Sequence, residues 1–176
     1  MKSWAFKDCI LANWKSLMMA FLLTYVMYSN ASRIPVGREL IGALSGLTFA
    51  ALLSYGLLNA RSSGVLQYFS VGLGSFRRVI AELLLAYSSV AAISSFFMTR
   101  SLEAALSALF AMPAFAISIL LLPEWLGRIT PIALILGIEY IMKELSMINL
   151  MTAELCTSAI AILLTLLPQA EEFANK

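Results

Sequence analysis

The chain has 176 residues, of which 61% are hydrophobic and only 12% are charged, and its formal net charge is +2. Soluble domains contain about 45–50% apolar and about 25% charged residues, so this composition is typical of a protein embedded in a lipid bilayer. The small net charge gives no reason to expect a nucleic-acid partner. The absence of histidine excludes histidine-based general-base catalysis and histidine-ligated metal or haem.

The N-terminal residues 1–15 are the first element with a recognisable pattern. They combine lysines with Trp4, Phe6, Ile10 and Trp14, of which the last three form an i, i+4 row on a helix. Tryptophan prefers the headgroup level of a bilayer, and lysine prefers its cytoplasmic leaflet. We therefore expect a helix that lies along the cytoplasmic interface, and the alternative is an ordinary basic flank of the first span.

Six stretches along the chain are candidate membrane spans, of which the first has a short apolar core, Leu17–Tyr28, and the last two contain charged residues. A spanning helix needs about 20 mostly apolar residues, and a charge at its centre costs about 2.5–3.5 kcal/mol on insertion scales. The predicted spans are 16–30, 39–60, 79–99, 103–123, 129–148 and 151–168. This predicts an all-α, polytopic membrane protein with one transmembrane domain over residues 1–176. Because the last two spans carry acidic residues, five spans are the alternative.

Residues 61–78 form the longest predicted connection between spans. The segment is uncharged between its terminal arginines and is rich in serine and glycine. Ser62 or Ser63 could cap a short helix on which Val65, Leu66 and Phe69 share one face. We expect a short helix at the cytoplasmic surface where a soluble partner could dock, and the alternative is a re-entrant or interfacial loop.

Basic residues predict the orientation of the spans. With six spans and both termini in the cytoplasm, twice as many basic residues lie inside as outside, as the positive-inside rule favours. The cytoplasmic set is Lys2, Lys7, Lys15, Arg61, Arg77, Arg78, Arg128 and Lys176, and the opposite set is Arg33, Arg38, Arg100 and Lys143. We therefore expect a multi-pass protein of the cell (plasma or inner) membrane.

Charged residues within or beside the spans are candidates for a polar path. Glu139 and Lys143 are one helical turn apart, Glu144 follows them, and Glu154 lies near the start of the last span. Such residues line substrate paths or proton relays, or they mark the ends of spans, and the sequence leaves both interpretations open. Glu82 follows two arginines and is expected near the inner interface.

The sequence contains no phosphate-binding loop and no cysteine–histidine cluster. Without histidine, no serine–histidine–aspartate triad can form. We therefore expect neither catalysis nor a bound cofactor or metal in this chain.

Two stretches carry a resemblance to a known family. They read Ser63-Gly64-Val65-Leu66-Gln67-Tyr68-Phe69 and Arg77-Arg78-Val79-Ile80-Ala81-Glu82-Leu83. The predicted order of elements is an N-terminal interfacial helix, two spans, a short cytoplasmic helix that begins with a glycine, and four further spans. This order resembles that of the permease subunits of type 2 ATP-binding-cassette exporters. In size, in layout and in its Pro35-Val36-Gly37 stretch, the chain is similar to the haem exporter B subunits of cytochrome c maturation. Gln67 stands where that family has an acidic residue.

The resemblance implies a division of labour between chains. This chain would form the membrane path as a homo- or heterodimer, and a separate ATPase subunit would bind ATP. The residues implied in coupling to that ATPase are Arg61, Ser63, Gly64, Val65, Leu66, Gln67, Phe69, Arg77 and Arg78. The alternative functions are a non-transporting membrane anchor or structural subunit, and an ion-coupled carrier that would rely on Glu139 and Glu154.

Overall fold

The computed structural model of the chain describes residues 13–31, 37–58, 73–141 and 147–166. Every regular element in these ranges is a helix, which confirms the all-α fold class. The helices are α1 (Trp14–Ala31), α2 (Arg38–Ser54), α5 (Leu73–Thr99), α6 (Leu102–Leu121), α7 (Glu124–Ile141) and α8 (Met147–Thr165). A further helical turn extends α2 to Leu58.

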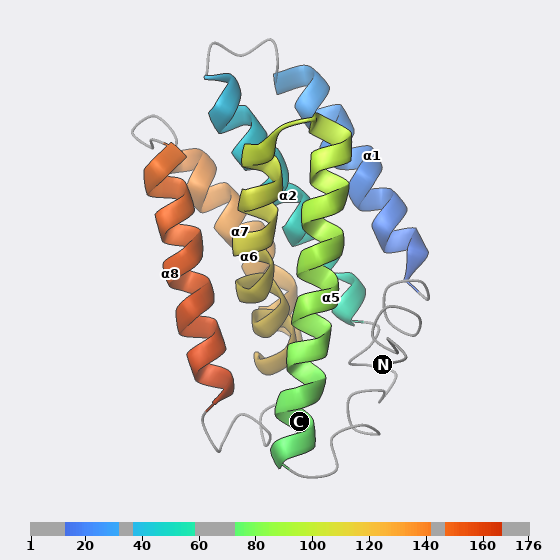
Figure 1. Cartoon of the computed structure of the whole chain (residues 1–176), viewed down its shortest axis with the longest axis vertical. Coiled ribbons are helices and arrows are strands. Elements are labelled where there is room, and N and C mark those ends of the chain that lie inside the picture. The colour runs from blue at the N-terminus through green and yellow to red at the C-terminus, as the bar shows by residue number, and fades with distance from the viewer. Residues whose placement is uncertain (1–12, 32–36, 59–72, 142–146, 167–176) are drawn as a thin grey trace.

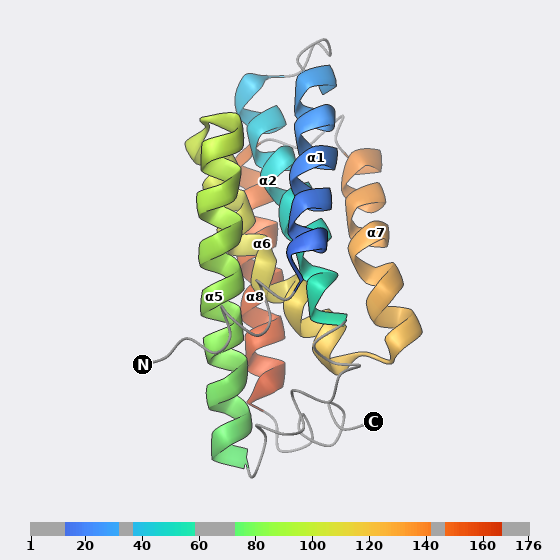
Figure 2. The same cartoon turned by 90° about the vertical axis from the view of Figure 1, so that its right-hand side faces the viewer.

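The six helices form an elongated bundle in which consecutive helices run in opposite directions (Figures 1 and 2). We call the end where α1, α5 and α7 begin the proximal end, and the end where α2, α6 and α8 begin the distal end. The start of α1 and the end of α8 therefore both lie toward the proximal end (Figure 1).

Within the part of the chain that the structure describes, three helices are long and apolar enough to cross a bilayer, namely Arg38–Leu58, Arg78–Thr99 and Leu102–Leu121. Asn149–Thr165 is apolar but shorter. Large apolar side chains also lie on the outside of the bundle, among them Leu22 of α1, Phe97 of α5, Trp125 of α7 and Leu163 of α8. An apolar exterior of this kind suits lipid and not water, so the structure indicates a membrane protein. A total of six spans stays a prediction.

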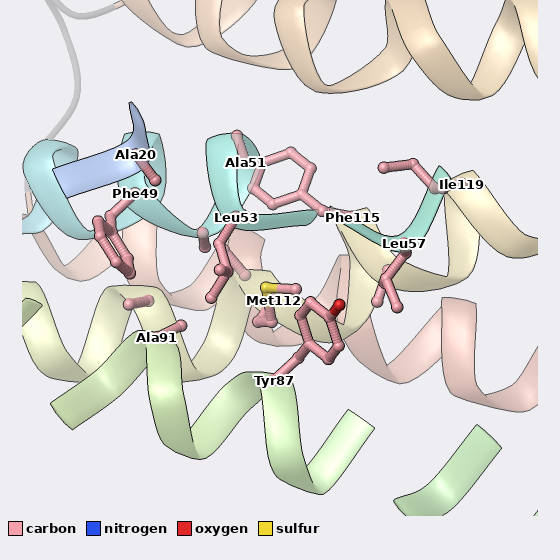
Figure 3. Close-up of a cluster of buried hydrophobic side chains, with 14 of the residues drawn as sticks. Ala20, Phe49, Ala51, Leu53, Leu57, Tyr87, Ala91, Met112, Phe115 and Ile119 are labelled. Atoms are coloured by element: carbon pink, nitrogen blue, oxygen red, sulfur yellow. The ribbon is translucent and has the colours of Figure 1, made fainter. Parts of the chain in front are cut away.

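The apolar core lies where α1, α2, α5 and α6 meet (Figure 3). Its labelled members are Ala20, Phe49, Ala51, Leu53, Leu57, Tyr87, Ala91, Met112, Phe115 and Ile119. Phe21 of α1 packs edge-to-face on Phe49 of α2, with ring centroids 5.2 Å apart. Because α2 contributes buried side chains along most of its length, it is the central helix around which the others pack.

A close helix contact joins α2 to α6. Gly42 and Gly46 are one turn apart on α2 and face the start of α6. A Cβ atom on Gly46 would clash with the Ala104 carbonyl oxygen and lie 2.8 Å from its carbonyl carbon. Because glycine has no side chain, these two backbones can approach closely, as in the Gly-x-x-x-Gly packing of membrane helices.

A tight turn between α5 and α6 makes these two helices antiparallel. Arg100 adopts a left-handed conformation, with φ of 52°, and its N–H donates to the Phe96 carbonyl at 2.7 Å. Ser101 then caps α6 by accepting a hydrogen bond from the Ala104 N–H at 3.2 Å. Its hydroxyl also donates to the Glu103 carboxylate at 2.6 Å. These contacts fix the first turn of α6 and thereby the register of the helix against its neighbours.

Each described helix begins before its predicted span, and the difference is four residues or more for α5, α7 and α8. α5 starts at Leu73, so residues 73–78 of the predicted coupling segment form its first turns. With 27 residues, α5 is about 40 Å long, whereas the hydrocarbon core of a bilayer is about 30 Å thick. α7 starts at Glu124, directly after Pro123, and includes Arg128, which is exposed. The predicted spans were bounded by charged residues. A helix can continue through charged residues where its end reaches water, so the helices are longer than the apolar runs.

Candidate functional site at the α6–α8 interface

One narrow face of α8 is buried and polar. The buried positions are Leu150, Glu154, Ser158 and Thr165, which recur at helical spacing, while most of the remaining described residues of α8 are exposed. Glu154 is only 4% exposed and Ser158 only 5%. Polar groups thus face the bundle and apolar groups face outward, which is the arrangement expected of a helix in lipid.

Glu154 forms a hydrogen bond across the interface to α6. The Ser107 hydroxyl donates to Glu154 Oε1 at 2.5 Å, and Ser107 is itself fully buried. The other carboxyl oxygen, Oε2, is buried and has no hydrogen-bond partner among the described residues. A carboxyl group held in this way, away from water and half satisfied, is energetically expensive and is therefore a candidate functional group.

One turn further along α8, Ser158 bonds to the backbone of α6. Its hydroxyl donates to the Phe110 carbonyl and accepts a hydrogen bond from the Ala114 N–H at 3.2 Å. These two backbone groups flank Pro113, which has no N–H and lies in the interior of α6. A serine from a neighbouring helix is one way in which membrane proteins satisfy backbone groups beside a proline. Ser158 therefore links α8 to the α6 backbone on either side of its proline.

The other predicted polar residues lie apart from this interface or outside the described residues. Glu82 lies on α5, where Arg78 Nε approaches its Oε1 at 3.3 Å in an exposed i, i+4 pair. Glu139 belongs to α7 by its backbone. Lys143 and Glu144 are outside the part of the chain that the structure describes. Glu154 is therefore the predicted path residue for which the structure defines an environment.

The predicted coupling residues fall largely outside the described ranges. This applies to Arg61, Ser63, Gly64, Val65, Leu66, Gln67 and Phe69. Arg77 and Arg78 lie near the start of α5, and the Arg78 side chain is 72% exposed. The described helix ends on either side of this segment, the end of α2 and the start of α5, both lie at the proximal end (Figure 1).

Aromatic and basic groups gather toward the proximal ends of α1, α2 and α7. Trp14 begins α1 and is 56% exposed, and Trp125 lies in the first turn of α7. Tyr55, just after α2, donates its hydroxyl hydrogen to the Arg128 carbonyl at 2.7 Å. Tyr55 and Lys15 also line a groove of about 280 Å³ between α1 and α2. Exposed tryptophans together with basic residues are typical of the level where a membrane protein meets the headgroups.

Sequence reasoning did not identify Ser107, Ser158 or the pair Gly42 and Gly46. The glycine pair had a readable signal, since two glycines four residues apart in an apolar helix favour close helix packing. Glu154 and Ser158 are also four residues apart, which places them on one helix face. Ser107 had no comparable signal, because only the fold brings it to Glu154.

In the described residues, no three side chains from histidine, cysteine, aspartate and glutamate group closely enough to hold a metal ion. The candidate site is therefore a carboxyl and two hydroxyl groups between two apolar helices. Comparisons of the chain with protein-family models, with curated proteins and with solved structures give no match.

Proposed function

We propose that this chain is the permease subunit of an ATP-driven exporter, that it forms the translocation path as a dimer, and that a separate ATPase subunit powers it. The observation that carries the proposal is where the two helix ends lie that this connection joins. The end of α2 and the start of α5 are both at the proximal end, where α1 also begins (Figure 1), and Arg78 near the start of α5 is exposed. A docking segment for a cytoplasmic ATPase needs this placement.

The distribution of charge supports a cytoplasmic location for the proximal end. Lys15, Arg78 and Arg128 belong to the proximal parts of α1, α5 and α7. The distal ends carry Arg38 and Arg100. An excess of basic residues on one side is what the positive-inside rule associates with the cytoplasm. Both termini are then cytoplasmic, in a multi-pass protein of the cell membrane.

The filled interior of the bundle supports a dimer. The core between α1, α2, α5 and α6 is closed by large side chains such as Phe49, Tyr87 and Phe115. A translocation path would therefore run between two permease chains and not through one. Exposed apolar faces on α5 and α8 offer surface for such an interface as well as for lipid.

The same filled core supports the second candidate, a non-transporting membrane subunit that anchors or stabilises a larger complex. A membrane anchor needs no translocation path, so a bundle with a filled core is compatible with this function. The two functions differ in whether an ATPase binds to the segment between α2 and α5.

The test is to purify the tagged chain from mildly solubilised membranes of its own cell and identify the co-purifying proteins by mass spectrometry. We expect an ATPase with a G-x-x-x-x-G-K-[ST] phosphate-binding loop in equal copy number with the permease. Phe69→Asp should abolish its recovery, because a charge in the apolar docking face cannot be buried in a groove. Phe173→Asp, which makes the same change in the predicted cytoplasmic tail, is the matched control.

Recovery of the ATPase with Phe69→Asp at the wild-type level would contradict the coupling role of this segment. Recovery of membrane subunits alone, with no ATPase, would favour the anchor. If an ATPase is recovered, haem is the first substrate class to test in reconstituted vesicles, because of the resemblance to haem exporter subunits.

A further inference from the structure

The position of Glu154 along α8 places it well inside the apolar part of the bundle. It is seven residues after Met147, where α8 begins, which corresponds to about 10 Å along the helix axis. Its partner Ser107 is in the second turn of α6, which begins at the same distal end. The residues that follow on both helices are mainly apolar until the proximal end. The carboxyl is thus nearer to the distal surface than to the proximal one.

The charged groups on the helices that pack against α8 do not neutralise Glu154. α6 carries one, Glu103, which lies one turn before Ser107 and is engaged by the Ser101 hydroxyl. α2 carries Arg38 and Glu39 in its first turn, at the distal end. No ion pair with Glu154 is present within the described ranges. Among the described residues, an ionised Glu154 would therefore be stabilised by one hydrogen bond, from the Ser107 hydroxyl.

We propose that Glu154 binds a proton inside the α6–α8 interface, and that the presence of this proton keeps α8 packed on α6. Burying a neutral carboxyl group in an apolar environment costs far less free energy than burying a carboxylate. The Ser107 hydroxyl donates to Oε1, which leaves the buried Oε2 to carry the proton. This role of Glu154 is independent of whether the chain couples to an ATPase.

Loss of the proton would act on both helices. A carboxylate at this position is stabilised by reaching water or headgroups, and the nearest are at the distal surface, so deprotonation favours a movement of α8 away from α6. Such a movement also breaks the contact of Ser158 with the α6 backbone on either side of Pro113. A helix with a proline in its interior bends most easily there. The site would therefore convert a change in proton occupancy into a change in the packing and shape of α6.

The direct test is infrared spectroscopy of the full chain in lipid nanodiscs during a pH titration. A protonated carboxyl shows a C=O stretching band that the carboxylate lacks. We expect such a band in the wild-type protein, its loss as pH rises, and its absence in Glu154→Gln. In Ser107→Ala the band should move to higher frequency, because the hydrogen bond to Oε1 is lost. Glu103→Gln is the matched control and should leave the band unchanged.

The second test measures the thermal unfolding midpoint by tryptophan fluorescence from about pH 5 to about pH 9. The wild-type midpoint should fall by several degrees as pH rises, since the folded state must give up its proton. Glu154→Gln, which imitates the neutral acid, should match the wild type at low pH and stay constant, and Glu103→Gln should retain the wild-type pH dependence. These measurements need no transport activity.

A wild-type protein without a Glu154-dependent carboxyl band at any pH in this range would overturn the proposal. So would a midpoint whose pH dependence persists unchanged in Glu154→Gln, or one that follows sodium concentration instead of pH. If Glu154→Gln does not fold, the shift of the wild-type band in Ser107→Ala decides alone.

Discussion

Gly46→Ala tests the close contact between α2 and α6. The new Cβ would overlap the Ala104 carbonyl oxygen and lie 2.8 Å and 3.0 Å from its carbonyl carbon and Cα. All three atoms are backbone, so no side chain can rotate to make room. The helices must separate, or α6 must shift along α2, and either movement also displaces Ser107 from Glu154.

The expected loss of stability follows from two opposing effects. Overpacking a well-filled interface costs about 1–3 kcal/mol. Replacing glycine by alanine inside a helix recovers up to about 1 kcal/mol of propensity. The net expectation is a destabilisation of about 1–2 kcal/mol, which lowers the unfolding midpoint of a chain of this size by about 2–8 °C.

The assay is thermal unfolding in nanodiscs, compared across a series of Gly→Ala variants. Gly37→Ala is the control, because a Cβ there meets nothing within 4 Å. The unfolding midpoint of Gly42→Ala should lie between those of Gly37→Ala and Gly46→Ala. Its Cβ meets the Ser101 side chain, which can rotate at the expense of the α6 cap. A Gly46→Ala variant as stable as Gly37→Ala would refute the close backbone contact.

Three further substitutions are predicted, each measured by the same unfolding assay. Ser158→Ala should cost about 1–2 kcal/mol because it leaves part-buried α6 backbone groups without this partner, whereas Thr157→Ala, on the exposed side of α8, should cost little. Arg100→Gly should stabilise the protein by about 1 kcal/mol, because glycine adopts a φ of 52° without strain, and Arg100→Ala should not. Ser101→Ala should cost about 1 kcal/mol and increase hydrogen exchange in the first turn of α6.

The membrane location of the chain and its all-helical fold class were predictable because both depend on local composition. A run such as Leu102–Leu121 has no charge after Glu103, and in lipid a helix is the only conformation of a single segment that satisfies its own backbone. Helix boundaries were less predictable. α5 and α7 extend several residues beyond the apolar runs, since charged residues are compatible with helix wherever they reach water or headgroups.

The candidate site was likewise predictable only in part. The sequence placed Glu154 on a helix beside apolar residues but left open whether it lined a path or marked a boundary. The tertiary structure identified the partner of Glu154, since Ser107 is separated from it by 47 positions and meets it only because α6 and α8 pack together.

The sequence by itself determined that the chain is helical and belongs in a bilayer, because burial in lipid is a property of each segment separately. Only the tertiary structure decided which helix faces meet. Lipid is as apolar as the side chains of the helices, so their hydrophobicity does not select partners. Selection instead depends on a small residue such as Gly46 meeting a backbone, and on a polar residue such as Glu154 meeting a donor.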